Sequence, residues 1–182
     1  MDKLPDETIT ADRLHLGADE ITVLATSAQS GGALFAVEVS MQPGGGPPLM
    51  HRHDPGEVYH VLRGEFVFYV GSDDGRVRRV TAGTGDVVPL AGRTPHTIRN
   101  ESDSEAVAFV VHAPGPPMEG FIREAAALAA ESGSSMEAVL AIATRHGIEM
   151  LGPVPELAPS EPSHAHSARW PLPGCSCLAT SS

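Results

Sequence analysis

Three histidines and one glutamate near the middle of the chain have the residue types and the spacing of metal ligands. His51 and His53 are separated by one residue. Alternate residues of a strand point to the same face, so both imidazoles can reach one metal ion. The segment 54–56 (Asp-Pro-Gly) predicts a turn, after which Glu57 begins the next strand and can add its carboxylate. His96, which begins a later strand, supplies the fourth ligand.

Three neutral imidazoles and one carboxylate suit a divalent transition metal. The ligand set is compatible with Fe, Mn, Ni, Co, Cu or Zn and does not choose among them. With four protein ligands on one side, a six-coordinate metal keeps two adjacent positions for a chelating substrate, or for substrate and O2 together. Such a site suits oxygenation of an enol or catechol-like compound, and equally a Lewis-acid role in isomerisation. Glu57 is also a candidate catalytic residue, as a general base that accepts a substrate proton.

The segments that must position these ligands read as short strands. From residue 8 to residue 114, β-branched and alternating runs are separated by glycine and proline. This texture predicts a sandwich or barrel rather than a parallel sheet with crossover helices. The clearest predicted strands are 21–25, 33–40, 58–62, 66–70, 76–80, 97–100 and 106–112.

After the Pro-Gly-Pro-Pro segment at 114–117 the pattern becomes helical. Residues 118–128 approximate one apolar helix face, and a second helix is predicted to begin at Ser135 and to run to about residue 145. We expect both helices to pack on the outside of the barrel and to close one end. The predicted organisation is N-terminal strands that join the barrel, the barrel, a helical segment and a disordered tail, over 1–32, 33–115, 116–152 and 153–182.

The segment that carries His51 resembles the first motif of the cupin superfamily. That motif, G-x5-H-x-H-x3-E-x6-G, is matched at every fixed position, from Gly45 through the three ligands to Gly64. Gly64 is expected to allow a tight turn into the following strand. The spacing of the whole motif is far more specific than a lone His-x-His pair.

The segment that carries His96 resembles the second cupin motif, G-x5-P-x-G-x2-H-x3-N. Gly85, His96 and Asn100 match it. Ala91 and Arg93 stand where the motif has its proline and its middle glycine. The loop before His96 is therefore where this chain departs from the pattern.

The resemblance implies an all-β fold: a cupin double-stranded β-helix, or jelly-roll barrel, with two C-terminal helices. It implies one metal ion on His51, His53, Glu57 and His96. More loosely, the segment 118–149 resembles the C-terminal helices of bacterial cupins described as quercetin-dioxygenase-like. That likeness favours a dioxygenase or oxygenase acting on an enol, catechol or flavonol-like substrate. A metal-dependent isomerase or epimerase, and a small-ligand-binding cupin without catalysis, remain as alternatives.

Further residues are candidates for the pocket around the metal. Tyr59 shares a strand face with Glu57 and should point into the barrel. Ile98 and Asn100 are expected to point inward from the strand that His96 begins, and Arg93 lies in the loop that borders the metal.

Two other histidines are not expected to bind the metal. His60 lies on the strand face opposite to Glu57, so it should be on the outside of the barrel. His112 stands at the end of a predicted strand, where core or rim packing is the plainer interpretation.

Composition excludes several classes of partner. The net charge of −11 disfavours nucleic acid and anionic membranes. The N-terminus has no basic region followed by an apolar run, and no stretch approaches the ~20 apolar residues of a membrane helix. We therefore expect a cytoplasmic protein with a small-molecule substrate. We also expect a homodimer, because barrels of this kind expose an edge strand and an apolar outer face.

Overall fold

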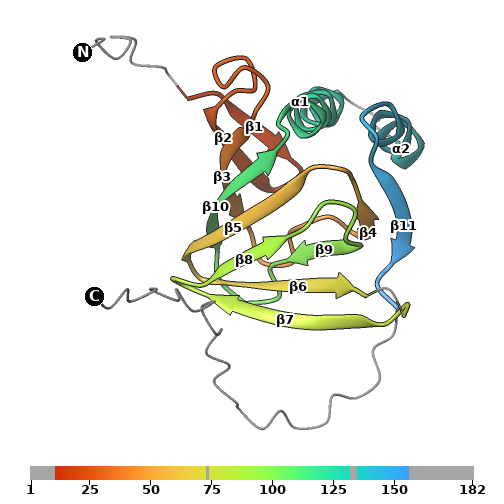
Figure 1. Ribbon diagram of the computed structural model, residues 1–182. Helices are drawn as coiled ribbons and strands as arrows, with labels where there is room; N and C mark the ends of the chain where they lie inside the picture. Colours follow the sequence, from red (N-terminus) through yellow and green to blue (C-terminus); the bar gives the residue numbers. More distant parts are fainter. Residues whose placement is uncertain (1–10, 73, 132–134, 156–182) are drawn as a thin grey trace, which may run out of the picture.

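The computed structural model describes residues 11–72, 74–131 and 135–155. Two antiparallel sheets face each other, and two helices lie next to each other at one end of the sheets (Figure 1). The predicted all-β barrel followed by two helices is confirmed. Within the described ranges no helix combines the length and the apolar character needed to cross a membrane.

The two sheets hold six and five strands. The first sheet has the order β1 (Arg13–Leu16), β2 (Asp19–Ala25), β3 (Phe35–Met41), β10 (Ala106–Ala113), β5 (Gly56–Arg63) and β8 (Val87–Leu90). The second sheet has the order β11 (Glu149–Pro153), β4 (Leu49–Arg52), β9 (His96–Arg99), β6 (Glu65–Gly71) and β7 (Val77–Gly83). The helices are α1 (Pro116–Ala130) and α2 (Met136–Arg145).

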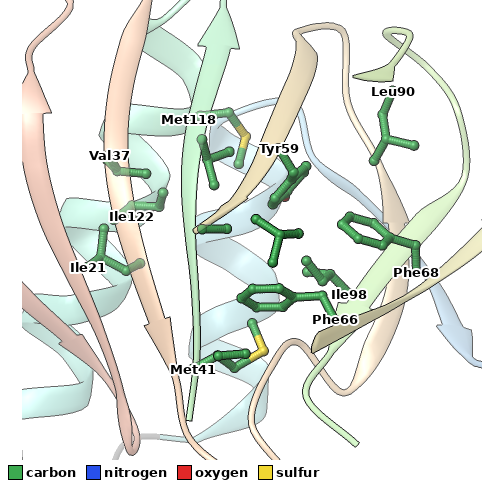
Figure 2. Packing of buried hydrophobic residues seen from close by; sticks show 14 of the residues in the cluster. Ile21, Val37, Met41, Tyr59, Phe66, Phe68, Leu90, Ile98, Met118 and Ile122 are labelled. Atoms are coloured by element: carbon green, nitrogen blue, oxygen red, sulfur yellow. The ribbon is translucent and has the colours of Figure 1, made fainter. Parts of the chain in front are cut away.

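The core lies between the sheets and extends to α1. Phe66 and Phe68 on β6 are fully buried, and each such side chain stabilises the fold by roughly 1.5–3 kcal/mol. Figure 2 shows side chains from both sheets meeting Met118 and Ile122 of α1 in one cluster. The helices therefore share the core of the barrel.

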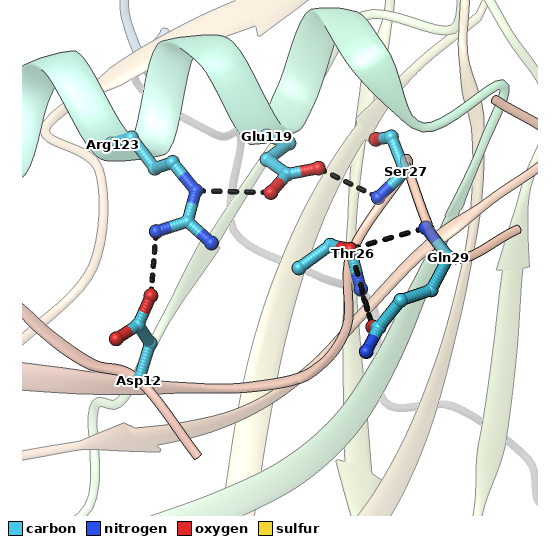
Figure 3. A network of polar contacts seen from close by, with 6 residues as sticks. All are labelled: Asp12, Thr26, Ser27, Gln29, Glu119 and Arg123. Carbon is cyan, nitrogen blue, oxygen red and sulfur yellow. Dashed lines mark hydrogen bonds and ion pairs between the residues drawn. The ribbon is translucent and has the colours of Figure 1, made fainter. Parts of the chain in front are cut away.

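Polar contacts fix α1 against the N-terminal strands (Figure 3). Glu119 accepts a hydrogen bond from the backbone N–H of Ser27 at 2.7 Å. Arg123 donates to Glu119 and to Asp12, both at 2.9 Å. The second helix begins as predicted, because the Ser135 hydroxyl accepts a hydrogen bond from the backbone N–H of Ala138. Both helices thus have defined positions at the end of the barrel.

Two glycines of the first motif occupy places where a side chain would not fit. Gly64, between β5 and β6, has a φ of 73°, and a Cβ there would lie 2.7 Å from the carbonyl oxygen of Glu105. A Cβ on Gly45 would lie 2.2 Å from Oδ1 of Asp19. The predicted tight turn at Gly64 is confirmed, and Gly45 is required by a close approach of its backbone to Asp19.

Strand β11 was not predicted. It is a short edge strand that contains Gly152 and Pro153, two residues that weaken a strand pattern, and it forms by pairing with β4, where Met150 faces His51. The predicted tail, 153–182, begins at Pro153, which is the last residue of this strand. Residues 156–182 of the tail lie outside the described residues.

The outer face of β5 and β8 is apolar and exposed. Val58, Leu62 and Val87 are 43%, 40% and 58% exposed, and His60 lies among them, outside the barrel as its strand position predicts. The expected homodimer stays a prediction.

Candidate metal site

The fold brings the three predicted histidine ligands together inside the barrel. His51 lies on β4 and pairs with His96 of β9 across the second sheet, and His53 follows β4 directly. All three side chains are buried. One ring nitrogen from each histidine lies within 4.8 Å of those of the other two. The three residues form a buried cluster of suitable size for one metal ion.

Backbone carbonyl groups orient all three rings. The Nδ1 atoms of His51, His53 and His96 lie 3.3, 2.9 and 2.8 Å from backbone carbonyl oxygens two residues away in the sequence. A carbonyl oxygen only accepts hydrogen bonds, so the proton belongs on Nδ1 and the lone pair on Nε2. Histidines that bind metals are commonly held in this way. The hydrogen bond donated by Nδ1 fixes the orientation of the ring, so that the lone pair of Nε2 points to the metal.

Glu57 enters the same space from β5 of the opposite sheet. Its Oε1 lies 2.9 Å from Nε2 of His53, and its Oε2 lies 3.4 Å from Nε2 of His96. Nε2 of His53, Nε2 of His96 and Oε2 of Glu57 are buried without a hydrogen-bond partner. Unsatisfied buried polar atoms are costly, and a metal ion at this point would satisfy them together. The residues present therefore fit a metal ion.

The charges of the site follow from burial and from close contacts. Burial, together with nearby His96, lowers the pKa of His51 to about 4. Burial alone would raise the pKa of Glu57, but His112, His53 and His96 together hold it well below its usual value. Burial also opposes protonation of His96, yet contact with the Glu57 carboxylate raises its pKa overall. Glu57 is thus ionised and His51 is neutral at pH 7, the forms that bind a metal ion.

His112 is a member of the site that sequence reasoning missed. It lies on β10 directly opposite Glu57 of β5, and its Nδ1 is 3.1 Å from Oε1 of Glu57. The ring is buried and stacks on Phe35, with 6.0 Å between ring centroids. The interpretation as core packing was right about burial but overlooked this contact. His112 thus restrains the carboxylate that faces the ligand histidines.

We expect His112→Leu to weaken metal binding by roughly 10–100-fold, the usual effect of removing a group that orients a metal ligand. The reason is that Glu57 would lose the partner that holds its carboxylate. Competition with a chromogenic chelator measures the dissociation constant. His112→Gln, whose amide can still donate to Glu57, should recover part of the affinity. Equal affinity of His112→Leu and the wild type would contradict this role.

A cavity of about 350 Å³ reaches the site from the helical end of the barrel. Its polar lining side chains are Asp19, His51, Glu57, Tyr59 and His112, and the other lining residues are apolar or glycine. Of the predicted pocket residues, Tyr59 and Ile98 line this cavity. Burial and the nearby Glu57 carboxylate raise the pKa of Tyr59 well above its usual value, so the hydroxyl keeps its proton.

Arg93 and Asn100, the other two predicted pocket residues, do not line the cavity. Arg93 has a φ of 67°, and its half-exposed side chain donates to Asp54 outside the barrel. Its backbone N–H nevertheless donates to the carbonyl oxygen of His53 at 2.7 Å, so the loop supports a ligand. Asn100 is buried and donates to the carbonyl oxygens of Met41 and Ser104. Both residues shape loops next to the site.

The left-handed backbone at Arg93 is testable. Such a conformation costs a residue with a side chain roughly 1–2 kcal/mol, and glycine avoids that cost. Arg93→Ala and Arg93→Gly both lose the exposed ion pairs, which contribute little. We therefore expect the free energy of unfolding in urea to be about 1 kcal/mol higher for Arg93→Gly than for Arg93→Ala. An alanine variant as stable as the glycine variant would show that residue 93 is not held in this conformation.

Comparison with known proteins agrees with this fold. Residues 37–112 match the family described as "Cupin domain". No curated protein matches the chain. Many solved structures are similar. Oxalate decarboxylase from Bacillus subtilis has a TM-score of 0.52 and 18% identity over 58% of this chain and 28% of that chain.

A second oxalate decarboxylase, from Lactobacillus farciminis in complex with formate, has a TM-score of 0.50 and 18% identity over 57% of this chain and 30% of that chain. The present chain thus spans about 30% of the length of these relatives. The Bacillus subtilis enzyme has Mn(II) centres. At such identity the likeness concerns the fold alone. The chain therefore contains a cupin domain over residues 37–112, with His51, His53 and His96 as its candidate metal site.

Proposed function

We propose that this protein is a metal-dependent oxygenase that acts on a neutral, largely apolar small molecule with an acidic hydroxyl or enol group. The observation that carries the proposal is the cavity that joins the buried carboxylate of Glu57 and the ligand His51 to a largely apolar space. A carboxylate that borders a largely apolar cavity can contact the hydroxyl of a bound substrate and accept its proton.

The lining of the cavity favours a neutral substrate. None of the lining residues that the structure describes is a lysine or an arginine, and the acidic members are Asp19 and Glu57. Asp19 already accepts hydrogen bonds from the backbone N–H groups of Gln42 and Gly46. A small dicarboxylate such as oxalate would find a cationic partner at the metal alone, and the rest of the lining favours a neutral molecular body. Sugars and nucleotides would leave many polar groups without partners against apolar walls.

The residues of the site have distinct proposed roles. We propose that His51, His53, His96 and Glu57 hold the metal, which would polarise a bound substrate oxygen and engage O2. Glu57 takes the proton from the substrate hydroxyl as that O–H bond breaks. His112 keeps the carboxylate in place, and the protonated Tyr59 offers a hydrogen-bond donor to the substrate. The apolar walls exclude water from this group of residues.

The test is O2 consumption by the full chain loaded separately with Fe(II), Mn(II), Co(II) or Ni(II), with a panel of neutral flavonols, catechols and 1,3-diketones. We expect substrate loss and O2 consumption in equal amounts with at least one metal. Conversion that continues without O2 would overturn the proposal in favour of an isomerase. Tight binding of a panel member without conversion would overturn it in favour of a ligand-binding cupin.

A further inference from the structure

The wall of the cavity opposite the polar residues is built by segments outside the cupin domain. Half of the lining residues lie outside residues 37–112, on β1, β2, α1, α2 and the segment around β11. The polar lining side chains, except Asp19, lie inside the cupin domain. The cavity thus has a polar group near the histidines, a separate acidic side chain at Asp19 on β2, and an apolar wall made largely by the two helices.

We infer that this helical wall receives the apolar body of the substrate and determines which substrates bind. The ligand class is an elongated neutral molecule with an apolar, aromatic-sized body and one polar end. The inference rests on the proposed function in one respect: the polar end is taken to face Glu57.

The residue pattern of α1 supports a binding wall. Met118, Ile122, Ala125 and Ala129 recur at positions i, i+4, i+7 and i+11, so they lie along one face of the helix, and all line the cavity. Two of these four residues are alanine, which leaves space where a larger side chain would fill it. A largely apolar cavity of about 350 Å³ falls within the range of small-molecule sites.

The wall is held in place before any ligand binds. Glu119 and Arg123 on the far side of α1 bind Ser27 and Asp12 (Figure 3). The end of α2 is tied to α1, because Glu124 contacts Arg145 and lies 2.9 Å from Nε2 of His146. A site that is already ordered loses less entropy on binding. These contacts make the cavity a built feature of the fold.

The experiment uses N-phenylnaphthylamine, a neutral fluorescent probe, titrated into the full-length protein with and without Mn(II). We expect saturable binding that does not require the metal. Ala125→Leu should weaken binding about tenfold or more, because the new side chain occupies the cavity. Ala127→Leu, on the exposed face of the same helix, is the matched control and should change the dissociation constant less than about twofold. The sulfonated analogue of the probe, anilinonaphthalene sulfonate, should bind the wild type about tenfold more weakly than the neutral probe does. The reason is that none of the described lining residues has a cationic side chain.

Each outcome bears on the inference. Absence of probe binding to the wild type, or equal binding by Ala125→Leu, would overturn it. Tight binding of the sulfonated probe would overturn the ligand class. If Ala125→Leu fails to fold by near-UV circular dichroism, Ala129→Leu replaces it, since Ala129 also lines the cavity. Wall-dependent binding without O2 consumption would leave this inference standing and refute the oxygenase. O2 consumption without probe binding would refute this inference and leave the proposed oxygenase standing.

Discussion

We expect the His96→Ala variant to bind a divalent transition metal more than about 100-fold more weakly than the wild type. Loss of a residue that merely orients a ligand costs roughly 10–100-fold, and loss of a ligand should cost more. A metal at 100 times its dissociation constant raises the free energy of unfolding by about 2.7 kcal/mol, or roughly 5–10 °C in Tm. Thermal melts with and without added metal should show this shift for the wild type and at most about 0.4 kcal/mol of it for His96→Ala.

His60→Ala is the matched control for His96→Ala. His60 is an exposed histidine on the outside of the same barrel, so its removal should leave the metal-induced Tm shift unchanged. A full metal-induced Tm shift in His96→Ala would show that metal binding does not depend on the buried cluster. Loss of the shift in both variants would mean that the effect of His96→Ala is not specific to the buried cluster.

We expect Glu57→Gln to lower kcat for O2-dependent turnover by about 10²–10⁴-fold, the usual contribution of a general base. Glutamine keeps the size of the side chain but has no negative charge with which to accept a proton. The measurement is the initial rate of O2 consumption with the panel member that the wild type converts. Metal content is measured in parallel, so that loss of the base is separated from loss of the metal.

Glu65→Gln is the control for Glu57→Gln, because Glu65 is an exposed glutamate at the start of β6. It should retain the full rate. A metal-loaded Glu57→Gln variant with wild-type kcat would contradict the role of Glu57 as the base, whatever the substrate.

His51 and His53 could be predicted from the sequence because their spacing is local. His51 and His53 are two positions apart on a predicted strand, so their side chains point to the same face. The motif around them has no mismatch. The position of His96 was predicted despite the substitutions at Ala91 and Arg93. The structure explains why the loop tolerates the arginine: residue 93 keeps a positive φ, and its side chain points outward.

His112 could not be recognised in this way, because its role depends on strand register. Residue 112 faces Glu57 only through the pairing of β10 with β5, two strands separated by more than 40 residues of sequence. The available signal was a histidine on the same strand face as the inward Ala108 and Val110. That signal predicts burial, as was found, but not the partner.

The apolar wall of the cavity could not be predicted from the sequence either. The apolar face of residues 118–128 predicted a helix that closes the barrel, and α1 does so. Periodicity cannot tell whether such a face packs solidly or leaves space, because this depends on side-chain volumes from several segments. Strand β11 likewise exists because β4 offers a free edge, which no local pattern of residues 149–153 reveals.

The most direct test of the metal site is elemental analysis of the full-length protein purified without added metal, beside a variant with alanine at His51, His53 and His96. The structure predicts close to one transition-metal ion per wild-type chain and almost none in the triple variant, because the cluster can hold a single ion. A triple variant that retains the metal of the wild type, or a wild type that stays metal-free even after incubation with Mn(II), Fe(II) and Ni(II), would contradict the site.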